Sequence, residues 1–144
     1  MSRHVPSSEI IAAARRYKGT PFRHQGRSAR GLDCLGLLAV SFMDVGMAVD
    51  DETNYGRQPE LFKLKAALDR RFIRVPRAQH FHTGLVALFY DISWLHVGLM
   101  TGNNKFIHSR GPEEIGPGVV EHILDAKSWA PRLLRMWRHP QMEW

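Results

Sequence analysis

The residues Gly31-Leu32-Asp33-Cys34-Leu35-Gly36-Leu37-Leu38 set a polar pair, Asp33-Cys34, directly before an apolar stretch that continues to about Val45. This length of apolar sequence favours a buried helix closed by Gly46. A thiol at the start of such a helix faces unpaired backbone N–H groups and the positive end of the helix dipole, which favour thiolate over thiol. The same N–H groups, including that of Cys34, could receive an oxyanion. We therefore expect a nucleophile, Cys34, at a helix N-terminus.

A thiol nucleophile needs a general base, and the base needs a group that orients it. The stretch 95–100 alternates like a half-buried strand, a turn follows at Gly102-Asn103-Asn104, and a second strand covers 105–108. His96 and His108 lie an even number of positions apart, so a hairpin centred on Gly102 sets them opposite each other on one face. The pattern predicts His96 as the base and His108 as the residue that holds its tautomer.

Other uses of the same residues stay open. A lone buried cysteine is more often packing than catalysis, but here the Asp-Cys helix start and the two hairpin histidines favour catalysis together. One Cys with two His is also a known zinc ligand set, yet the sequence has no Cys-x-x-Cys or His-Glu-x-x-His beside it. We expect neither a metal nor another cofactor. The pair His80-x-His82 is typical of a polar loop.

The rest of the chain predicts helices before strands. One helix is expected over 8–18, with Ser7 as its N-cap and an end at Gly19 and Pro21, and another over 59–68, starting at Pro59. Strands are expected over 72–75, 85–90, 95–100, 105–108, 119–123 and 133–137. This order, in a chain of 144 residues, predicts a single α+β domain over 1–144 with an antiparallel sheet.

Composition and charge limit the kinds of partner and location that we expect for the protein. Lysine and arginine outnumber acidic residues 20 to 14, giving a net charge of +6, which suits nucleic acid, an anionic cell wall or an acidic protein neighbour. The basic residues are scattered, without an aromatic array, so direct nucleic-acid recognition is not expected. No stretch approaches the ~20 apolar residues of a membrane span. Residues 1–17 lack the apolar segment of an export signal, so we expect synthesis in the cytoplasm without a signal peptide.

Four short segments together resemble one family. The run Gly19-Thr20-Pro21-Phe22-Arg23-His24-Gln25-Gly26, then Gly31 to Leu37, then His96-Val97-Gly98, then Phe106-Ile107-His108 resemble the NlpC-type cell-wall peptidases. The likeness is closest to the short phage tail branch, in which His-Gln follows the Thr-Pro step and Leu follows the Cys. The likeness covers about Ile10 to Pro140, and the four segments follow one another in the order expected of the family.

The resemblance implies a papain-like α+β fold, with N-terminal helices packed on an antiparallel sheet, and hydrolysis of peptidoglycan stem peptides. The usual target in the family is the bond between γ-D-glutamate and diaminopimelate. The resemblance implies that Cys34 is the nucleophile, His96 the base and His108 the orienting residue. It also places Asp33, Phe22 and His24 on the substrate side, where Asp33 can meet the amino end of the stem. Three departures bear on specificity: Phe22 replaces a common Tyr, Leu35 a common Ser, and Gly84-Leu85-Val86 a common Gly-Asp-Val.

The phage branch implies a place of action. A peptidase in a phage tail tip would reach the wall from outside and open it locally for DNA entry, with other tail-tip proteins as its partners. The loop 111–118 could flank the groove or contact such a neighbour, or be a surface loop. Two other functions stay open: a structural tail-tip or hub protein with little activity, and an acyltransferase or amidase with the same Cys-His chemistry.

Overall fold

The computed structural model describes residues 4–57, 60–80, 82–91, 94–125 and 127–144. Within these ranges the chain forms the helices α1 (Ser7–Arg15), α2 (Cys34–Asp44) and α3 (Leu61–Arg71). The main sheet runs in the order β4 (Ile73–Val75), β9 (Leu133–Arg138), β5 (Val86–Asp91), β6 (Trp94–Gly102), β7 (Lys105–Arg110) and β8 (Gly118–Ile123). All neighbours in it are antiparallel.

Two short strand pairs complete the fold. Near the chain ends, β1 (Val5–Pro6) pairs in parallel with β10 (Met142–Glu143), and before α2, β2 (Arg27–Ser28) pairs with β3 (Gly31–Leu32). Short 3₁₀ turns cover Arg77–Gln79 and Ala130–Arg132. None of the helices in the described ranges is long and apolar enough to cross a bilayer.

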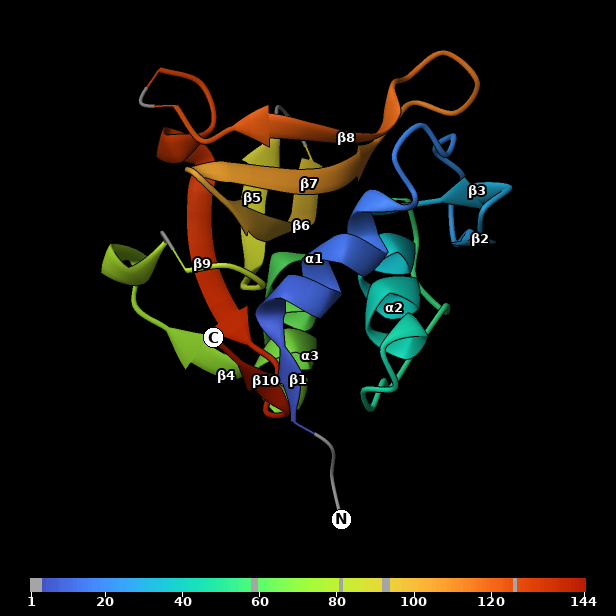
Figure 1. The fold of residues 1–144 in the computed structure, drawn as a ribbon. Coiled ribbons are helices and arrows are strands. Elements are labelled where there is room, and N and C mark those ends of the chain that lie inside the picture. Colours follow the sequence, from blue (N-terminus) through green and yellow to red (C-terminus); the bar gives the residue numbers. More distant parts are fainter. Residues whose placement is uncertain (1–3, 58–59, 81, 92–93, 126) are drawn as a thin grey trace.

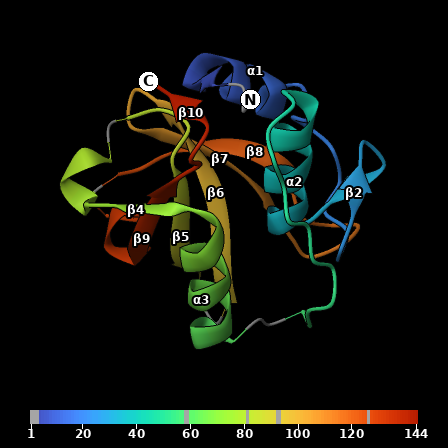
Figure 2. The same ribbon diagram turned by 90° about the horizontal axis from the view of Figure 1, so that it is seen from below.

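The helix that begins at Cys34 lies against the middle of the sheet. α2 contacts β6 and β7 of the sheet and also packs against α1 (Figure 1). α3 lies on the far side of the molecule from α1 (Figure 2) and leads directly into edge strand β4. The start of α2 is thus held beside the hairpin β6–β7, the two strands that carry His96 and His108.

The core explains why the central strands are almost continuously apolar. Val86 to Phe89 are fully buried, as are Val97, Leu99, Phe106 and Trp137 of neighbouring strands, and they pack in one cluster with Phe42 of α2. A strand covered on both faces has no solvent side on which polar residues would alternate. Packing of this kind holds β6 and β7 in a fixed position under α2.

The predicted α+β architecture is confirmed, and each predicted strand overlaps an observed one. The predicted capping of α1 is wrong: Ser7 is the first helical residue, after Pro6, and its hydroxyl bonds to that of Thr83 at 2.6 Å. The helix ends at Arg15, not Lys18. The predicted start of α3 at Pro59 lies outside the described residues, and this helix continues to Arg71.

Glu121 of β8 fastens the end of α1 to the sheet. Its carboxylate accepts from Arg15 Nε at 2.9 Å and Thr101 Oγ1 at 2.9 Å, and pairs with Lys18 Nζ at 2.7 Å. Burial by itself would raise the pKa of Glu121, but the hydrogen bonds from these three side chains bring it to about 2. The charged carboxylate therefore stabilises the folded state.

We expect Glu121→Gln to lower the free energy of unfolding at neutral pH by about 1–2 kcal/mol. The folded pKa lies below the ordinary 4.5, so this stabilisation is complete above about pH 4.5 and is lost as the pH falls toward 2. Urea unfolding at several pH values should show the variant and the parent converging over that interval. Glu114→Gln, on the exposed loop 111–118, is the matched control, and an equal gap at all pH values would contradict the assignment.

Candidate active site

Cys34 is the first residue of α2, as the sequence predicts. Asp33 before it has an extended backbone (φ −91°, ψ −175°), and its Oδ1 accepts the N–H of Gly36 at 2.7 Å. This is the geometry of a helix N-cap, in which a carboxylate satisfies one of the first free N–H groups. The cap fixes where the helix begins and therefore where the thiol lies. The side chain of Cys34 is partly buried.

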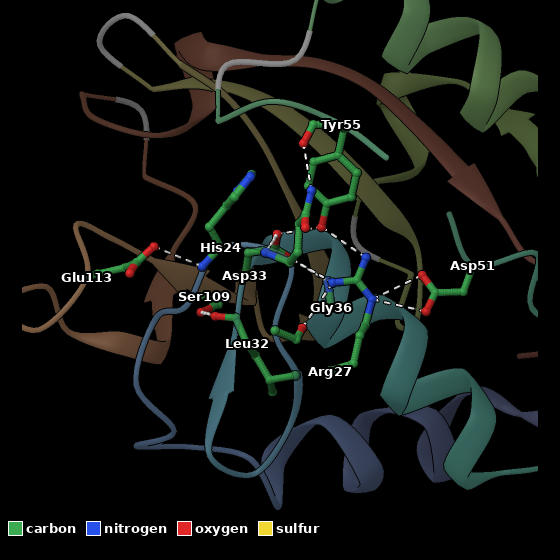
Figure 3. Close-up of polar contacts among 11 residues, drawn as sticks. His24, Arg27, Leu32, Asp33, Gly36, Asp51, Tyr55, Ser109 and Glu113 are labelled. Carbon is green, nitrogen blue, oxygen red and sulfur yellow. Dashed lines mark hydrogen bonds and ion pairs between the residues drawn. The ribbon is translucent and has the colours of Figure 1, made fainter. Parts of the chain in front are cut away.

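The carboxylate of Asp33 is saturated with donors from the protein. Besides Gly36 N, it accepts from Arg27 Nη1 at 3.1 Å, Gln25 N at 2.7 Å and the Tyr55 hydroxyl at 2.5 Å (Figure 3). Only 4% of Asp33 is exposed, and two carboxylate oxygens offer about four acceptor positions. An ammonium group of a substrate would have to replace one of these donors. The structure shows Asp33 organising the site, and its contact with a stem peptide stays a prediction.

Arg27 connects this carboxylate to a second one. Its Nε lies 3.0 Å from both carboxylate oxygens of Asp51, and its Nη2 donates to the Tyr55 hydroxyl at 2.9 Å. Figure 3 shows the guanidinium between the two acids, with Tyr55 beside it. The segment 51–55 is thereby fastened over the start of α2. Sequence reasoning missed Arg27, Asp51 and Tyr55, although a buried acid before the cysteine requires donors from elsewhere.

A buried hydroxyl aligns the helix start with the strand that carries His108. Ser109, the next residue of β7, donates to the carbonyl of Leu32 at 2.5 Å. Leu32 lies two residues before Cys34, and both Leu32 and Ser109 are fully buried. This bond and the packing of α2 on β6 and β7 position the thiol relative to the histidines.

His96 and His108 meet as predicted, but not as a directly opposed pair. His96 Nε2 is hydrogen-bonded to His108 Nδ1, with the ring centroids 4.6 Å apart. Asn103 and Asn104 form the two-residue turn, with φ 52° and 58°, and the pairing of Met100 with Phe106 centres the hairpin one residue later than Gly102. The register of Leu99 with Ile107 then sets His108 opposite Gly98, so the prediction of direct opposition is wrong. Even spacing still keeps both rings on one face.

Gly98 makes the diagonal contact of the two rings possible. A Cβ at this position would lie 2.8 Å from the carbonyl oxygen of Ile107 and 3.2 Å from His108 Cβ. Such distances are too short for a side chain without movement of β7. The hydrogen of Gly98 therefore leaves the space through which His108 reaches His96.

The environment of the Cys34 sulfur differs from the expectation of a thiolate. Burial raises the pKa of Cys34 to about 12, and the charge of Asp33 adds to the rise. Hydrogen bonds from the N–H groups of Val97, Leu35 and Cys34 act in the opposite direction but do not outweigh burial. Since Val97 follows His96 on β6, its contact also places the sulfur beside the strand of the base. Burial and the charge of Asp33 thus favour the neutral thiol over the thiolate.

Phe22 and His24 line the loop next to Asp33. Phe22 bridges to Leu32, and its ring lies against Gly111. His24 donates its backbone N–H to Glu113 at 3.1 Å, and its ring meets Tyr55 edge-on at 5.6 Å. Both residues thus join the loop 111–118 to the wall around Asp33. Their contact with substrate stays a prediction.

A third histidine extends the pair. His108 Nε2 lies 2.8 Å from His122 Nδ1 on β8, and Trp129 packs against all three imidazoles. Sequence reasoning missed His122, although it too is an even number of positions from His108, across the next hairpin. In the part of the chain that the structure describes, no group of three His, Cys, Asp or Glu side chains could hold a metal ion.

An apolar groove of about 1120 Å³ starts next to the site, between α2, α3 and the segment 48–56. Leu35, which follows Cys34, lies at one end, and Phe42, Leu64 and Phe72 line its interior. Its lining also includes polar side chains such as Tyr55, Lys63 and His139 but no cysteine, so the thiol chemistry belongs to the cluster around Cys34 and His96.

The raised pKa predicts low reactivity of the resting thiol. We expect iodoacetamide to alkylate Cys34 slowly at about pH 7, with a rate that still rises above about pH 9, because only the thiolate attacks. Asp33→Asn should speed alkylation in this range, since removing the neighbouring charge lowers the pKa of Cys34. The rates are read by mass spectrometry of the folded protein. A rate that levels off below about pH 8 would show a thiolate already formed.

Comparisons with known proteins agree with this geometry. The model of the NlpC/P60 family matches residues 19–138. The probable endopeptidase NlpC of Escherichia coli is 28% identical over 114 residues, which are 78% of this chain and 65% of that protein. This chain thus spans less than two thirds of the length of that relative.

Solved structures share the fold. An NlpC/P60 family protein of Bacillus cereus superposes with a TM-score of 0.70 at 18% identity, over 94% of this chain and 41% of that one. RipD of Mycobacterium tuberculosis, described as a non-catalytic NlpC/p60 domain protein adapted to peptidoglycan binding, superposes with a TM-score of 0.56 at 16% identity, over 90% and 95%. The papain-like arrangement is thus confirmed, and, since the family model covers most of its length, this chain belongs to the NlpC/P60 family.

Proposed function

We propose that this chain is a cysteine peptidase that cleaves the stem peptides of peptidoglycan, at the bond between γ-D-glutamate and diaminopimelate. The observation that carries the proposal is Cys34 at a capped helix start beside the strand of His96, whose ring is bonded to His108. The relative in E. coli, named a probable endopeptidase, supports the same reaction class.

The geometry supports a two-step acyl transfer. The sulfur of Cys34 attacks the carbonyl carbon of the scissile bond while His96 takes the thiol proton. The oxyanion that forms can be received by the N–H of Cys34 at the helix start. The intermediate collapses to a thioester, and the amine leaves with the proton from His96. Water, deprotonated by His96, then attacks the thioester and releases the carboxylic acid and the thiol.

The neutral resting thiol fits this sequence of steps. A sulfur with a raised pKa does not ionise on its own at neutral pH, so the proton has to move to His96 as the carbon–sulfur bond forms. His108 keeps the ring of His96 in place during this transfer through their hydrogen bond. Catalysis therefore depends on the two histidines more strongly than it would if the thiolate were already formed.

Purified protein should release stem-peptide fragments from isolated sacculi, and Cys34→Ala should abolish the release. His96→Ala should lower the rate by about 10³-fold, and His108→Ala less, at the lower end of the ~10²–10⁴-fold range of acid–base catalysis. Mass spectrometry of the products identifies the bond and separates a peptidase from an amidase or acyltransferase. Tyr90→Phe, at an exposed position of β5, is the control, and full activity of Cys34→Ala would end the proposal.

A non-catalytic role is the second candidate. Two observations favour it: the raised pKa of Cys34 and the fold shared with RipD, whose domain is non-catalytic. In this case the parent protein and Cys34→Ala would bind sacculi equally well, and neither would release fragments. Cleavage by the parent protein alone excludes this candidate.

We further propose that the protein acts in the tip of a phage tail, with other tail-tip proteins as partners. The supporting observations are the His24-Gln25 and Cys34-Leu35 steps typical of the phage tail branch, and the net charge of +6, which suits an anionic wall or acidic neighbours. An antibody against the chain should detect it in intact, density-purified particles from the producing cells. Its absence from such particles would remove this part of the proposal.

A further inference from the structure

We propose that His122 is a positioning residue for this site: it accepts a hydrogen bond from His108 and thereby holds His108 in the one tautomer that can serve His96. The inference rests on the proposed peptidase function. It adds a third imidazole, on a third strand, to the pair that the sequence predicts.

The three rings form a continuous chain across three strands. His108 Nδ1 is bonded to His96 Nε2 on one side, and His108 Nε2 lies 2.8 Å from His122 Nδ1 on the other. The register pairs Phe106 with His122 and His108 with Val120, so His122 is diagonal to His108, as His108 is to His96. The ring centroids of His108 and His122 are 4.9 Å apart.

Counting protons gives the direction of this chain. A neutral imidazole carries one N–H, and an imidazolium carries two. When His96 takes the proton of Cys34, its Nε2–H needs an acceptor, which is His108 Nδ1. A neutral His108 then carries its proton on Nε2 and must donate it. The acceptor within reach is His122 Nδ1, so His122 carries its own proton on Nε2.

The surroundings keep His108 neutral. It is fully buried, and burial lowers its pKa, as do the neighbouring His96, His122 and Arg110. The charged groups around the chain are Arg110 of β7 and Arg132 of the 3₁₀ turn, both stacked on Trp129 at 5.3 and 5.2 Å. On β8, Glu121 is held by Arg15 and Lys18. A second proton on His108 is thus disfavoured by burial and by the nearby charge of Arg110.

Trp129 packs over the hydrogen bond between His108 and His122 and shields it from water. Its ring stacks on His122 at 5.8 Å and meets His108 edge-on at 5.1 Å, and the residue is 6% exposed. A buried N–H without an acceptor is costly in such a place. His108 therefore takes the tautomer that both neighbours satisfy.

Loss of the acceptor at position 122 reverses the direction of the hydrogen bond between His108 and His96. With leucine at position 122, a proton on His108 Nε2 would be buried without a partner, so the proton moves to Nδ1. His108 then donates to His96 Nε2, and His96 carries its own proton on Nδ1. Both nitrogens of His96 are then unable to take the proton of Cys34. The expected defect is in the chemical step and not in substrate binding.

The test compares His122→Leu with His122→Asn, whose Oδ1 can replace Nδ1 as an acceptor. Nitrogen-15 NMR of the parent protein, without substrate, should show His108 protonated on Nε2. His122→Leu should show it on Nδ1 and lower kcat on sacculus fragments by at least ~10-fold, with KM unchanged. His122→Asn should restore the tautomer and most of kcat.

The outcomes separate this inference from the proposed function. An Nδ1 proton on His108 in the parent protein overturns the inference, as does a leucine variant that keeps both tautomer and kcat. A parent protein that cleaves nothing, yet shows the Nε2 tautomer and its reversal by leucine, retains the positioning role and contradicts the peptidase. If the leucine variant does not fold, the tautomer of the parent protein and the kcat of His122→Asn decide.

Discussion

The site depends on one buried carboxylate, that of Asp33. Its two oxygens close the first turn of α2 through Gly36 and hold the loop that carries Gln25 and Arg27. Tyr55 adds a hydroxyl from a segment more than twenty residues away. Removing any of these donors would leave a charge in a place with little water, which is costly. Asp33 therefore fixes the position of Cys34, and the hydrogen bond from Ser109 to Leu32 holds that position relative to β7, the strand of His108.

The sequence predicts the elements that local chemistry determines. A polar pair before an apolar run marks the start of α2, and even spacing sets His96 and His108 on one face. The bulge after Met100 shifts the register. No local pattern indicates it, because Asn103 and Asn104 favour the tight turn but do not show that an extra residue precedes it. α1 ends at Arg15, whose guanidinium bonds to Glu121 of β8, a long-range contact that no local pattern predicts.

The parts that sequence reasoning missed are long-range. Arg27, Asp51 and Tyr55 come together only because two loops meet over the helix start. Their residue types are ordinary in loops, and nothing in their spacing distinguishes them. The expected thiolate shows the same difficulty: a helix start favours the anion, but burial of the sulfur and the charge of Asp33 outweigh it. Burial is a property of the folded chain, and so is the sign of this shift.

The hydrogen side chain of Gly98 has a consequence for redesign of this hairpin. The two histidine rings meet through a volume that the smallest possible residue leaves empty, so their pairing is a matter of packing as well as of hydrogen bonding. An engineer who transplants the two imidazoles onto another β-ribbon would have to transplant the gap between them too. A larger residue at that place would press on the backbone of the neighbouring strand and on the Cβ of the second histidine.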